Sequence, residues 1–589
     1  MKKYWQILKG YKASLLACPL LVLVSVMCET IQPMYMADII DNGVMQRDLS
    51  VITAVGGKMV LISIVGLIFS IANVYVSSQA SIGFGTDLRT KLFGKIQQLS
   101  FFDIDRFSTA SLITRLTSDI SRIQQVIQVS MRLMLRSPLM LVMAVFFVVR
   151  INPELAGILL AAIPVLGFSV FFILRKGFPF FLKVQQKVDQ LNEVVRENLI
   201  NIRVVKSFVR EDFEARKFKD KSESLRDTVI HASNIIVAIF PVMQLVMNLS
   251  IIAILWMGGQ KVMAGELKVG ELISFVNYLA QVLMSLMMLS MIIMTYARAS
   301  ASSKRILEVL DTQPSLTDTP EGMRSTRQIE KGEIRFEKVS FRYGGGETDV
   351  LRNKKFPNPP GGAAVLRNIS FHIRPGETVA VAGATGSAKS SLVQLIPRLY
   401  DVSSGEIRID GIPVQDYNLH ELHARIGMVL QKNELFTGTI AENLRWGKPD
   451  ATQEELEEAA RAAEAHEFIC SLPAGYDTQL GRGGVNLSGG QKQRICIARA
   501  LLRKPKILIL DDSTSAVDSE TELRIRNNLN AWLHDTTVLI ITQRIYTMQS
   551  ANRVILLDDG EVESIGTPEE LLECSEMYRE IYHSQQIVI

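Results

Sequence analysis

A short glycine-rich segment ends in a lysine and two serines, and these residue types at this spacing point to phosphate chemistry. It follows an apolar run at residues 378–382 and precedes an apolar-periodic stretch, which predicts a strand, a loop and a helix in that order. Backbone N–H groups in such a loop and at the start of such a helix can surround phosphate oxygens. The residues are Gly383, Ala384, Thr385, Gly386, Ser387, Ala388, Lys389, Ser390 and Ser391. The pattern matches a Walker A loop, so we predict that it binds ATP, with Lys389 on the β- and γ-phosphates and the Ser390 hydroxyl on Mg²⁺.

Position 388 departs from that pattern, which places glycine before the lysine. Ala388 adds a methyl group, and this would strain the loop if the backbone there needs a positive φ. We expect ATP binding to survive the change in a weakened form.

A second segment narrows the class of ATP-binding protein. Residues 487–491 read Leu-Ser-Gly-Gly-Gln and open a predicted helix, so the amides near Ser488, Gly489 and Gly490 form another anion-binding helix end. This segment resembles the signature of ATP-binding-cassette (ABC) transporters. Together with the Walker A loop and the apolar strand that ends in Asp511, it makes the chain similar to ABC exporters over its whole length.

The resemblance implies roles for further residues. Tyr343 is the aromatic residue that stacks on adenine, and Gln431 is the Q-loop residue, with a catalytic and a metal-binding role. Asp511 is the Walker B carboxylate, Asp518 is the D-loop aspartate, and Gln491 completes the signature. In this family the signature of one cassette reaches the nucleotide on the Walker A loop of another, which implies that two cassettes pair head to tail.

Two catalytic positions depart from the ABC pattern. Asp512 follows Asp511 where these ATPases place a glutamate that polarises the attacking water, and Gln543 stands where the H-loop has histidine. Aspartate is one methylene shorter, so a water held about 3 Å from the glutamate would lie roughly 1.5 Å out of reach, and a misplacement of about 1 Å can cost about 100-fold in rate. A neutral amide can hydrogen-bond the γ-phosphate but brings no titratable nitrogen. We therefore expect ATP binding with impaired hydrolysis; the alternative is that both residues are tolerated variants in an active homodimer.

The elements that must position these residues divide into an apolar half and an α/β half. A bilayer span needs about 20 mostly apolar residues, and we predict six spans, at residues 13–36, 51–78, 127–149, 155–174, 233–258 and 272–297. Lys and Arg gather at the N-terminus and in segments 89–122 and 175–226, which predicts a multi-pass protein of a bacterial cytoplasmic membrane with both termini in the cytoplasm. The expected domains are an interfacial helix (1–12), a six-helix transmembrane domain (13–310), a linker (311–332) and a P-loop ATPase domain (333–589).

Two stretches between the spans keep helical periodicity beyond the bilayer, as at residues 188–202. Segments 101–119 and 202–208 resemble the intracellular loops of ABC exporters that carry coupling helices, although Ala110 stands where that pattern has glycine. We therefore expect these helices to protrude into the cytosol and to end where a soluble domain docks.

Polar and thioether side chains inside the spans leave two interpretations open. They either snorkel, pack and bond between helices, or they contact a translocated substrate. The polar residues are Glu29, Lys58, Arg132, Arg136, Gln244 and Asn248, and the methionines are Met284, Met287, Met288, Met291 and Met294. Thioethers form adaptable surfaces for varied apolar ligands, although helix packing and lipid contact are the more common uses.

One further segment has no assigned function. Residues 350–353 recur at 365–368 around the proline- and glycine-rich stretch 354–364. The prolines and glycines exclude a regular element, so we interpret it as a duplicated surface insertion that would disturb the placement of Tyr343.

The sequence as a whole predicts one half of an exporter. A net charge of +4 on 589 residues gives no case for nucleic-acid binding, and the fusion of ATPase and membrane domain argues against an importer subunit. We predict ATP-driven export of an amphipathic or hydrophobic substrate by a heterodimer with a second half-transporter, in which this chain supplies the degenerate ATP site. A small drug-like molecule, a lipid and a peptide all fit as the substrate. The alternatives are a homodimeric exporter and an ATP-gated channel or regulator with the same fold.

Overall fold

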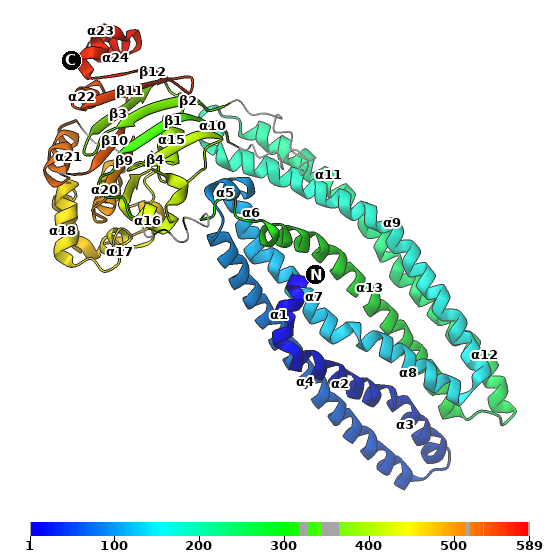
Figure 1. The fold of residues 1–589 in the computed structure, drawn as a ribbon. Coiled ribbons are helices and arrows are strands. Elements are labelled where there is room, and N and C mark those ends of the chain that lie inside the picture. The colour runs from blue at the N-terminus through cyan, green and yellow to red at the C-terminus, as the bar shows by residue number, and fades with distance from the viewer. Residues whose placement is uncertain are drawn as a thin grey trace. The chain divides into compact units, whose positions relative to one another are not determined.

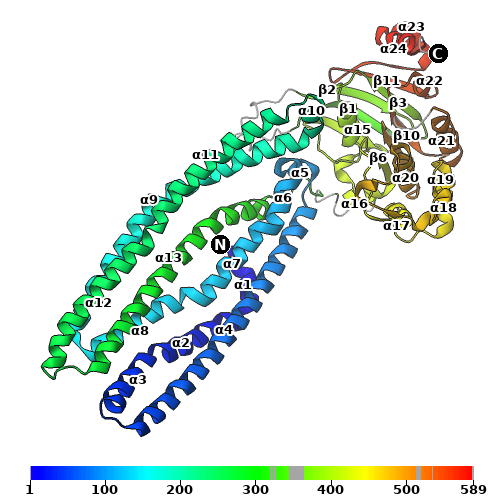
Figure 2. The ribbon, with the colours of Figure 1, turned by 180° about the vertical axis from the view of Figure 1, so that it is seen from behind.

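The computed structural model describes residues 2–586 except 319–321, 323–324, 326, 344–363, 513–518 and 534. The chain forms two compact units, one of residues 1–97 and 110–312 and the other of residues 98–109 and 313–589. Figure 1 and Figure 2 show the first as long helices and the second as sheets with helices around them. Residues 98–109 therefore fold with the second unit, although their neighbours in sequence on both sides belong to the first.

The first unit is helical throughout its regular elements. These are α1 (Lys2–Leu8), α2 (Lys12–Thr30), α3 (Gln32–Asp38), α4 (Leu49–Gln97), α6 (Thr109–Thr114), α7 (Ile120–Val129), α8 (Arg136–Ile151), α9 (Pro153–Ile200), α10 (Ile202–Ser207), α11 (Glu211–Val237), α12 (Ile239–Met263) and α13 (Val269–Asp311). Shorter turns join some of them: a 3₁₀ turn η1 (Lys9–Tyr11) and the π-helical turns η2 (Ile39–Val44), η3 (Arg115–Asp119) and η4 (Ser130–Met134).

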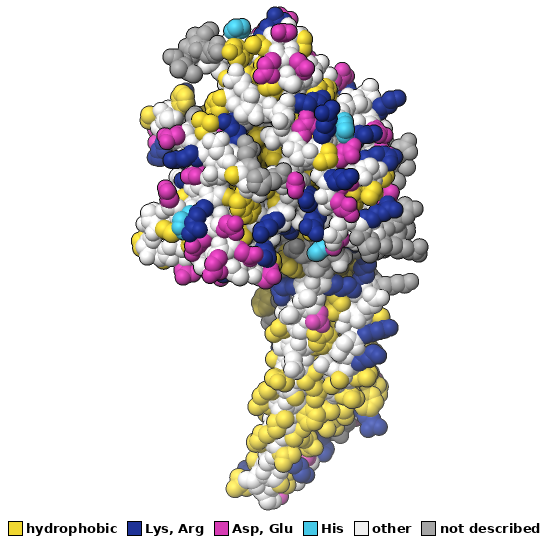
Figure 3. Space-filling view, turned by 60° about the vertical axis from the view of Figure 1, so that its left-hand side comes forward, with side chains coloured by type: hydrophobic (Ala, Val, Ile, Leu, Met, Phe, Trp, Pro, Cys, Tyr) yellow, Lys and Arg dark blue, Asp and Glu magenta, His cyan; other side chains and the backbone are white. Residues whose placement is uncertain are grey.

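Six helical segments of the described chain are long and apolar enough to cross a membrane, which confirms the six predicted spans. They are Lys3–Val44, Leu49–Gln97, Thr109–Ile151, Pro153–Gly177, Glu211–Met263 and Val269–Leu289. Helices suit the hydrocarbon core of a membrane because each helix satisfies its backbone hydrogen bonds internally. Many apolar side chains of these segments face outward, and Figure 3 shows them gathered over the lower part of the helical unit.

Several of these helices, α4 and α9 among them, are longer than a bilayer is thick. The helix α4 has 49 residues and α9 has 48, and at about 1.5 Å per residue each is more than twice the about 30 Å of a hydrocarbon core. Both therefore extend past a bilayer, as their periodicity predicts. The helix α9 packs along α11 over this extension, as both ribbon views show.

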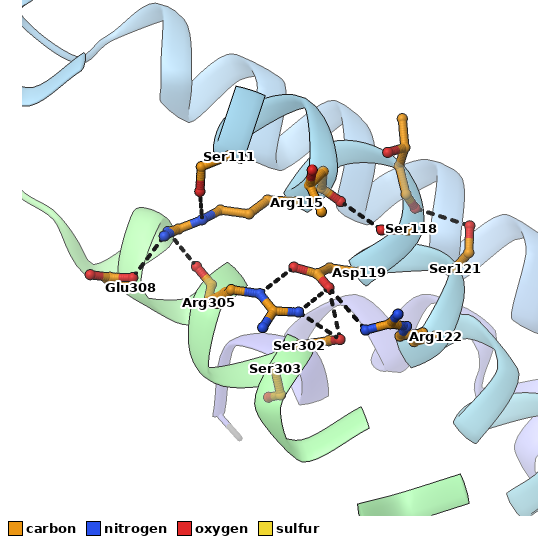
Figure 4. A network of polar contacts seen from close by, with 12 residues as sticks. Ser111, Arg115, Ser118, Asp119, Ser121, Arg122, Ser302, Ser303, Arg305 and Glu308 are labelled. Carbon is orange, nitrogen blue, oxygen red and sulfur yellow. Dashed lines mark hydrogen bonds and ion pairs between the residues drawn. The ribbon is translucent and has the colours of Figure 1, made fainter. Parts of the chain in front are cut away.

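A buried polar network joins η3 to the last turns of α13 (Figure 4). Asp119 is fully buried, and its carboxylate accepts hydrogen bonds from Arg305 Nε at 2.7 Å and from Ser302 Oγ at 2.8 Å. Arg115 donates to the Arg305 carbonyl at 2.8 Å and forms an ion pair with Glu308 at 3.0 Å. Removing one partner of a buried ion pair is strongly destabilising, so these contacts fix the packing of α13 against the segment that resembles the first intracellular loop.

The second unit contains one antiparallel sheet, one largely parallel sheet and a small two-stranded sheet in its described part. The antiparallel sheet has the order β2 (Leu366–Ile373), β1 (Ile334–Phe341), β4 (Ser404–Ile409) and β5 (Ile412–Pro413). The largely parallel sheet has the order β12 (Glu561–Gly566), β11 (Arg553–Asp558), β3 (Thr378–Gly383), β10 (Thr537–Ile541), β9 (Ile507–Asp511) and β6 (Ile426–Val429). The small sheet pairs β7 (Gly438–Thr439) with β8 (Gln479–Leu480).

Short helices accompany these strands. They are α5 (Phe101–Phe107), α15 (Lys389–Leu395), α16 (Leu419–Arg425), α17 (Ile440–Arg445), α18 (Gln453–Ala462), α19 (His466–Ser471), α20 (Gly489–Leu501), α21 (Ser519–Trp532), α22 (Ile545–Gln549), α23 (Pro568–Cys574) and α24 (Glu576–Gln586), with the 3₁₀ turns η5 (Val414–Asp416), η6 (Gly475–Asp477) and η7 (Arg482–Gly484).

Three central strands end at the same edge of the parallel sheet. The strand β10 pairs in parallel with β3 and with β9, and Ile541 lies opposite both Val381 and Asp511. All residues of β9 and β10 are buried, as expected for strands covered on both faces. The loops that follow these strands therefore meet at one edge, which is where ligands bind in open α/β sheets.

Candidate nucleotide site

The glycine-rich loop runs from the end of β3 to the start of α15, the strand–loop–helix arrangement that the sequence predicts. Gly383 has a φ of +148°, and a Cβ there would lie 2.1 Å from the Leu557 carbonyl oxygen. Only glycine therefore fits where β3 gives way to the loop.

Lys389 folds back over the loop that precedes it. Its ammonium donates hydrogen bonds to the carbonyl oxygens of Gly383 at 2.9 Å and Ala384 at 2.7 Å, and to Ser387 Oγ at 3.3 Å. Burial lowers the pKa of the Lys389 ammonium, while the nearby carboxylates of Asp511 and Asp512 act in the opposite direction. The lysine therefore lies where the loop surrounds it, with two carboxylates close by.

Ala388 occupies the left-handed region, with a φ of 71° and a ψ of 22°. The condition for strain at this position is therefore met. An L-residue in this region costs about 1–2 kcal/mol, because its Cβ approaches the following carbonyl oxygen. Ala388 is also partly buried against the core of the unit, so its methyl group contacts protein atoms.

Oxygen ligands suited to Mg²⁺ meet beside this loop. Ser390 Oγ donates a hydrogen bond to Asp511 Oδ1 at 3.0 Å, and the Gln431 side chain hydrogen-bonds the Asp512 carboxylate. Burial raises the pKa values of both Asp511 and Asp512. Mg²⁺ prefers hydroxyl, carboxylate and carbonyl oxygens, so Ser390 and Gln431 fit the metal role that the sequence predicts, and the Asp511 carboxylate beside Ser390 could share it.

Asp512 follows β9 directly and has a φ of +47°. Its backbone N–H donates to the Ile541 carbonyl at 3.2 Å, which ties it to the end of β10. Burial is the largest influence on its pKa, and the Gln431 hydrogen bond, Arg544 and Lys389 oppose that rise. A short carboxylate bonded to Gln431 therefore stands at the position where the family pattern places a longer one.

Gln543 lies just beyond the end of β10, and its side chain is exposed. Its loop is held from α24: Gln585 Nε2 donates to the Gln543 carbonyl at 2.6 Å, and Gln585 Oε1 accepts from the Ile545 N–H at 2.9 Å. On the other side Arg544 forms an ion pair with Glu522, which is 4% exposed and also accepts from Thr547 Oγ1 at 2.8 Å. Sequence patterns give no signal for Gln585 or Glu522.

Tyr343 joins an aromatic cluster beside the start of α15. Its hydroxyl lies 2.9 Å from Ser391 Oγ, and its ring meets Phe341 and Tyr400 edge-on at centroid distances of 4.7 and 5.4 Å. Tyr400 in turn contacts α5, because its hydroxyl donates to Asp105 Oδ2 at 2.9 Å. Tyr343 remains 43% exposed, which leaves a ring surface for stacking. The insertion at 354–364 lies outside the described residues except for its last residue.

The signature segment opens α20 through a capping box. Ser488 Oγ accepts from the Gln491 N–H at 3.3 Å, and Gln491 Oε1 accepts from the Ser488 N–H at 2.9 Å. Ser488 and Gly489 are exposed. The start of this 13-residue helix therefore presents amides to the outside of the unit. Asp518 lies outside the described residues.

The comparisons with known proteins agree with this arrangement. Residues 15–286 match the ABC transporter transmembrane region and residues 366–515 match the ABC transporter family. The uncharacterized ABC transporter ATP-binding protein YfiB of Bacillus subtilis is 42% identical over 99% of this chain and 98% of its own length. This chain belongs to the ABC transporter family. It combines the transmembrane and ATP-binding regions of an ABC exporter in a multi-pass membrane protein.

Two further proteins are similar to this ABC transporter over almost its whole length. The putative multidrug export ATP-binding/permease protein YgaD of Bacillus subtilis is 31% identical over 100% of this chain and 99% of its own. A bacterial Atm1-family ABC exporter solved with ATP bound has the same fold, with a TM-score of 0.77 over 99% of this chain and 97% of that one, at 24% identity.

Proposed function

We propose that this ABC transporter is one half of a heterodimeric exporter and that it supplies the degenerate one of two ATP sites. The observation that carries the proposal is Asp512, a carboxylate one methylene shorter than the family's glutamate at the residue after Asp511. Gln543 at the H-loop position supports the same conclusion, because an amide has no titratable nitrogen.

The residues of this site suit nucleotide binding better than hydrolysis. The loop amides, Lys389 and Tyr343 would hold the phosphates and the adenine. Ser390, Asp511 and Gln431 would hold Mg²⁺, which would neutralise phosphate charge when bound. Hydrolysis also needs a carboxylate within about 3 Å of the attacking water. Asp512 falls short of that position, and its hydrogen bond to Gln431 directs it toward the Q-loop.

The exposed start of α20 suits a role at the other site. Ser488 and the amides of Gly489 and Gly490 form a positive helix end that would face the γ-phosphate on the Walker A loop of the second half-transporter. Donors held in advance where charge develops stabilise the transition state of phosphoryl transfer. This chain then contributes to hydrolysis in trans although its own site hydrolyses poorly.

The proposal also covers the location of the termini, the substrate class and the domain bounds. The excess of Lys and Arg in segments 89–122 and 175–226 supports a cytoplasmic location of both termini. The similarity to YgaD, named for multidrug export, supports an amphipathic or hydrophobic substrate. The proposed domains remain an interfacial helix (1–12), a transmembrane domain (13–310), a linker (311–332) and a cassette (333–589).

The site itself can be tested without the second half-transporter. Nanodiscs selected for two copies of this chain contain two identical degenerate sites, each with an intact signature. Asp512→Glu should raise ATP turnover modestly, and Asp512→Glu with Gln543→His should raise it further, toward about 100-fold, because the carboxylate then reaches the water. Phosphate release per cassette measures both.

Exposed positions provide matched controls. Asp220→Glu, on α11 of the helical unit, and Gln549→His, on α22, make the same chemical changes at exposed positions outside the nucleotide site and should leave turnover unchanged. If neither site variant raises turnover, the geometric account of the defect fails. If the wild-type discs already match the double variant, the chain is an active homodimer.

A further inference from the structure

A cavity of about 800 Å³ opens within the helical unit. Residues of α2, α3, α4, α8 and α13 line it, and these helices neighbour one another in Figure 1. Sites for drug-sized ligands commonly span about 300–1,000 Å³, so the cavity has the volume of a ligand site.

An ion pair lies in the wall of this cavity. Arg136 on α8 and Glu29 on α2 are 2.5 Å apart, and their side chains keep 23% and 42% of their surface exposed. They are the charged residues among the described residues that line the cavity. The cavity therefore carries both signs of charge and no net charge.

Thioethers and amides form much of the remaining lining. The methionines are Met36, Met59, Met140, Met284 and Met288, and they present adaptable apolar surface. The amides are Gln32, Asn277 and Gln281. Gln281 Oε1 is buried and has no hydrogen-bond donor among the described residues, so this wall includes an acceptor that the protein leaves unpaired.

Net charge determines which ligands such a cavity accepts. A ligand with a single charge would leave that charge uncompensated away from water, which is costly. A zwitterionic head can place its cation against Glu29 and its anion against Arg136, so that each charge keeps an opposite neighbour. An uncharged head carries no charge that could pair with Glu29 or with Arg136.

We propose that this cavity binds an amphiphile with a zwitterionic head, which pairs with Glu29 and Arg136 while its apolar chain lies against the methionines. The inference rests on the proposed export function and names the substrate class of that function. A zwitterionic lipid of the bilayer and a soluble zwitterionic amphiphile share this chemistry.

Cys28 gives a direct readout because it lines the same cavity. The purified full chain is treated with N-ethylmaleimide, and the modification of each cysteine is followed by mass spectrometry. In phosphatidylglycerol nanodiscs, which supply no zwitterion, submicellar decylphosphocholine should slow Cys28 modification on the order of tenfold. Decyl sulfate and decyltrimethylammonium, with the same apolar chain, should have little effect, and exposed Cys470 should react equally throughout.

Variants of the Glu29–Arg136 ion pair should change which probe protects Cys28. Glu29→Gln leaves a net positive cavity and should shift protection toward decyl sulfate, and Arg136→Gln should shift it toward decyltrimethylammonium, each by about tenfold or more. The double variant should lose the discrimination among the three probes. Arg132→Gln, one turn away and outside the lining, should behave as wild type.

The lipid composition separates the two sources of ligand. If Cys28 is already protected in phosphatidylethanolamine nanodiscs without a probe, the bilayer supplies the ligand; if only decylphosphocholine protects it, a soluble amphiphile does. Equal protection by all three probes, or protection that ignores the charge variants, overturns the proposal. This readout needs no hydrolysis, so its failure leaves the test at Asp512 and Gln543 standing.

Discussion

At the scale of single residues, the Walker A loop of this chain contains a strained alanine. Ala388 has a φ of 71°, where an L-residue costs about 1–2 kcal/mol. The strain is present in the loop without a nucleotide. It therefore lowers the stability of the folded cassette more than it lowers the affinity for ATP. The family's glycine would remove this strain. It would also make the unfolded chain more flexible, which lowers stability by about 0.5–1 kcal/mol.

Ala388→Gly should therefore stabilise the chain. The net gain of about 0.5–1 kcal/mol corresponds to a rise of about 1–3 °C in the thermal unfolding midpoint of the cassette. Ala384→Gly, in the same loop but without a positive φ, should lower the midpoint instead. Thermal unfolding without nucleotide checks both signs. Tighter ATP binding with no change in stability would show that the free loop relaxes its strain.

The residues of the site differ in how far sequence predicts them. The loop follows the buried strand β3, Asp511 ends the buried strand β9 and Asp512 comes next, so local patterns place them at the sheet edge. The hydrogen bond between Gln431 and Asp512 joins residues about 80 positions apart, and no local pattern encodes that pairing. Sequence likewise does not show that Ala388 has a positive φ, because the fold of the loop sets that backbone angle.

At the scale of elements, the C-terminal helix α24 holds the loop after β10. Gln585 makes two hydrogen bonds to backbone groups of Gln543 and Ile545. The partners lie 42 and 40 residues apart in sequence, and the packing of α24 beside α22 brings them together. A single glutamine on a polar C-terminal helix carries no sequence signal for this role.

Gln585→Ala should loosen this loop without unfolding the cassette. A neutral hydrogen bond contributes about 0.5–1.5 kcal/mol, so the loss of two should accelerate hydrogen exchange of the Ile545 amide by about fivefold or more. Ser584→Ala on the same helix removes a hydroxyl that donates to the Ile581 carbonyl within α24, and it is the matched control. Unchanged exchange at Ile545 in the Gln585 variant would mean that other contacts hold the loop.

Sequence predicts the membrane spans but not the contacts between them. Hydropathy and length predict all six spans, because the bilayer imposes both on any helix that crosses it. The partner of each intramembrane charge was not predictable. Glu29 and Arg136 are 107 residues apart, and only the packing of α2 against α8 shows that they form an ion pair, which joins two helices and also faces a cavity.

At the scale of the whole molecule, we propose that the two ATP sites of the assembled exporter are unequal. In our proposal, the Walker A loop of this chain binds the nucleotide of the degenerate site, and its signature completes the competent site of the second half-transporter. Residues that never touch this chain's own nucleotide should then matter more for turnover than residues that bind it.

The most direct test compares two variants in the complex purified with its second half-transporter. Ser488→Arg fills the approach to the start of α20 and should remove nearly all ATP turnover, because the competent site loses its charge stabilisation in trans. Lys389→Ala should abolish nucleotide occupancy at the degenerate site and still leave a measurable fraction of turnover. Equal losses in the two variants, or normal turnover in Ser488→Arg, would contradict the assignment of unequal sites.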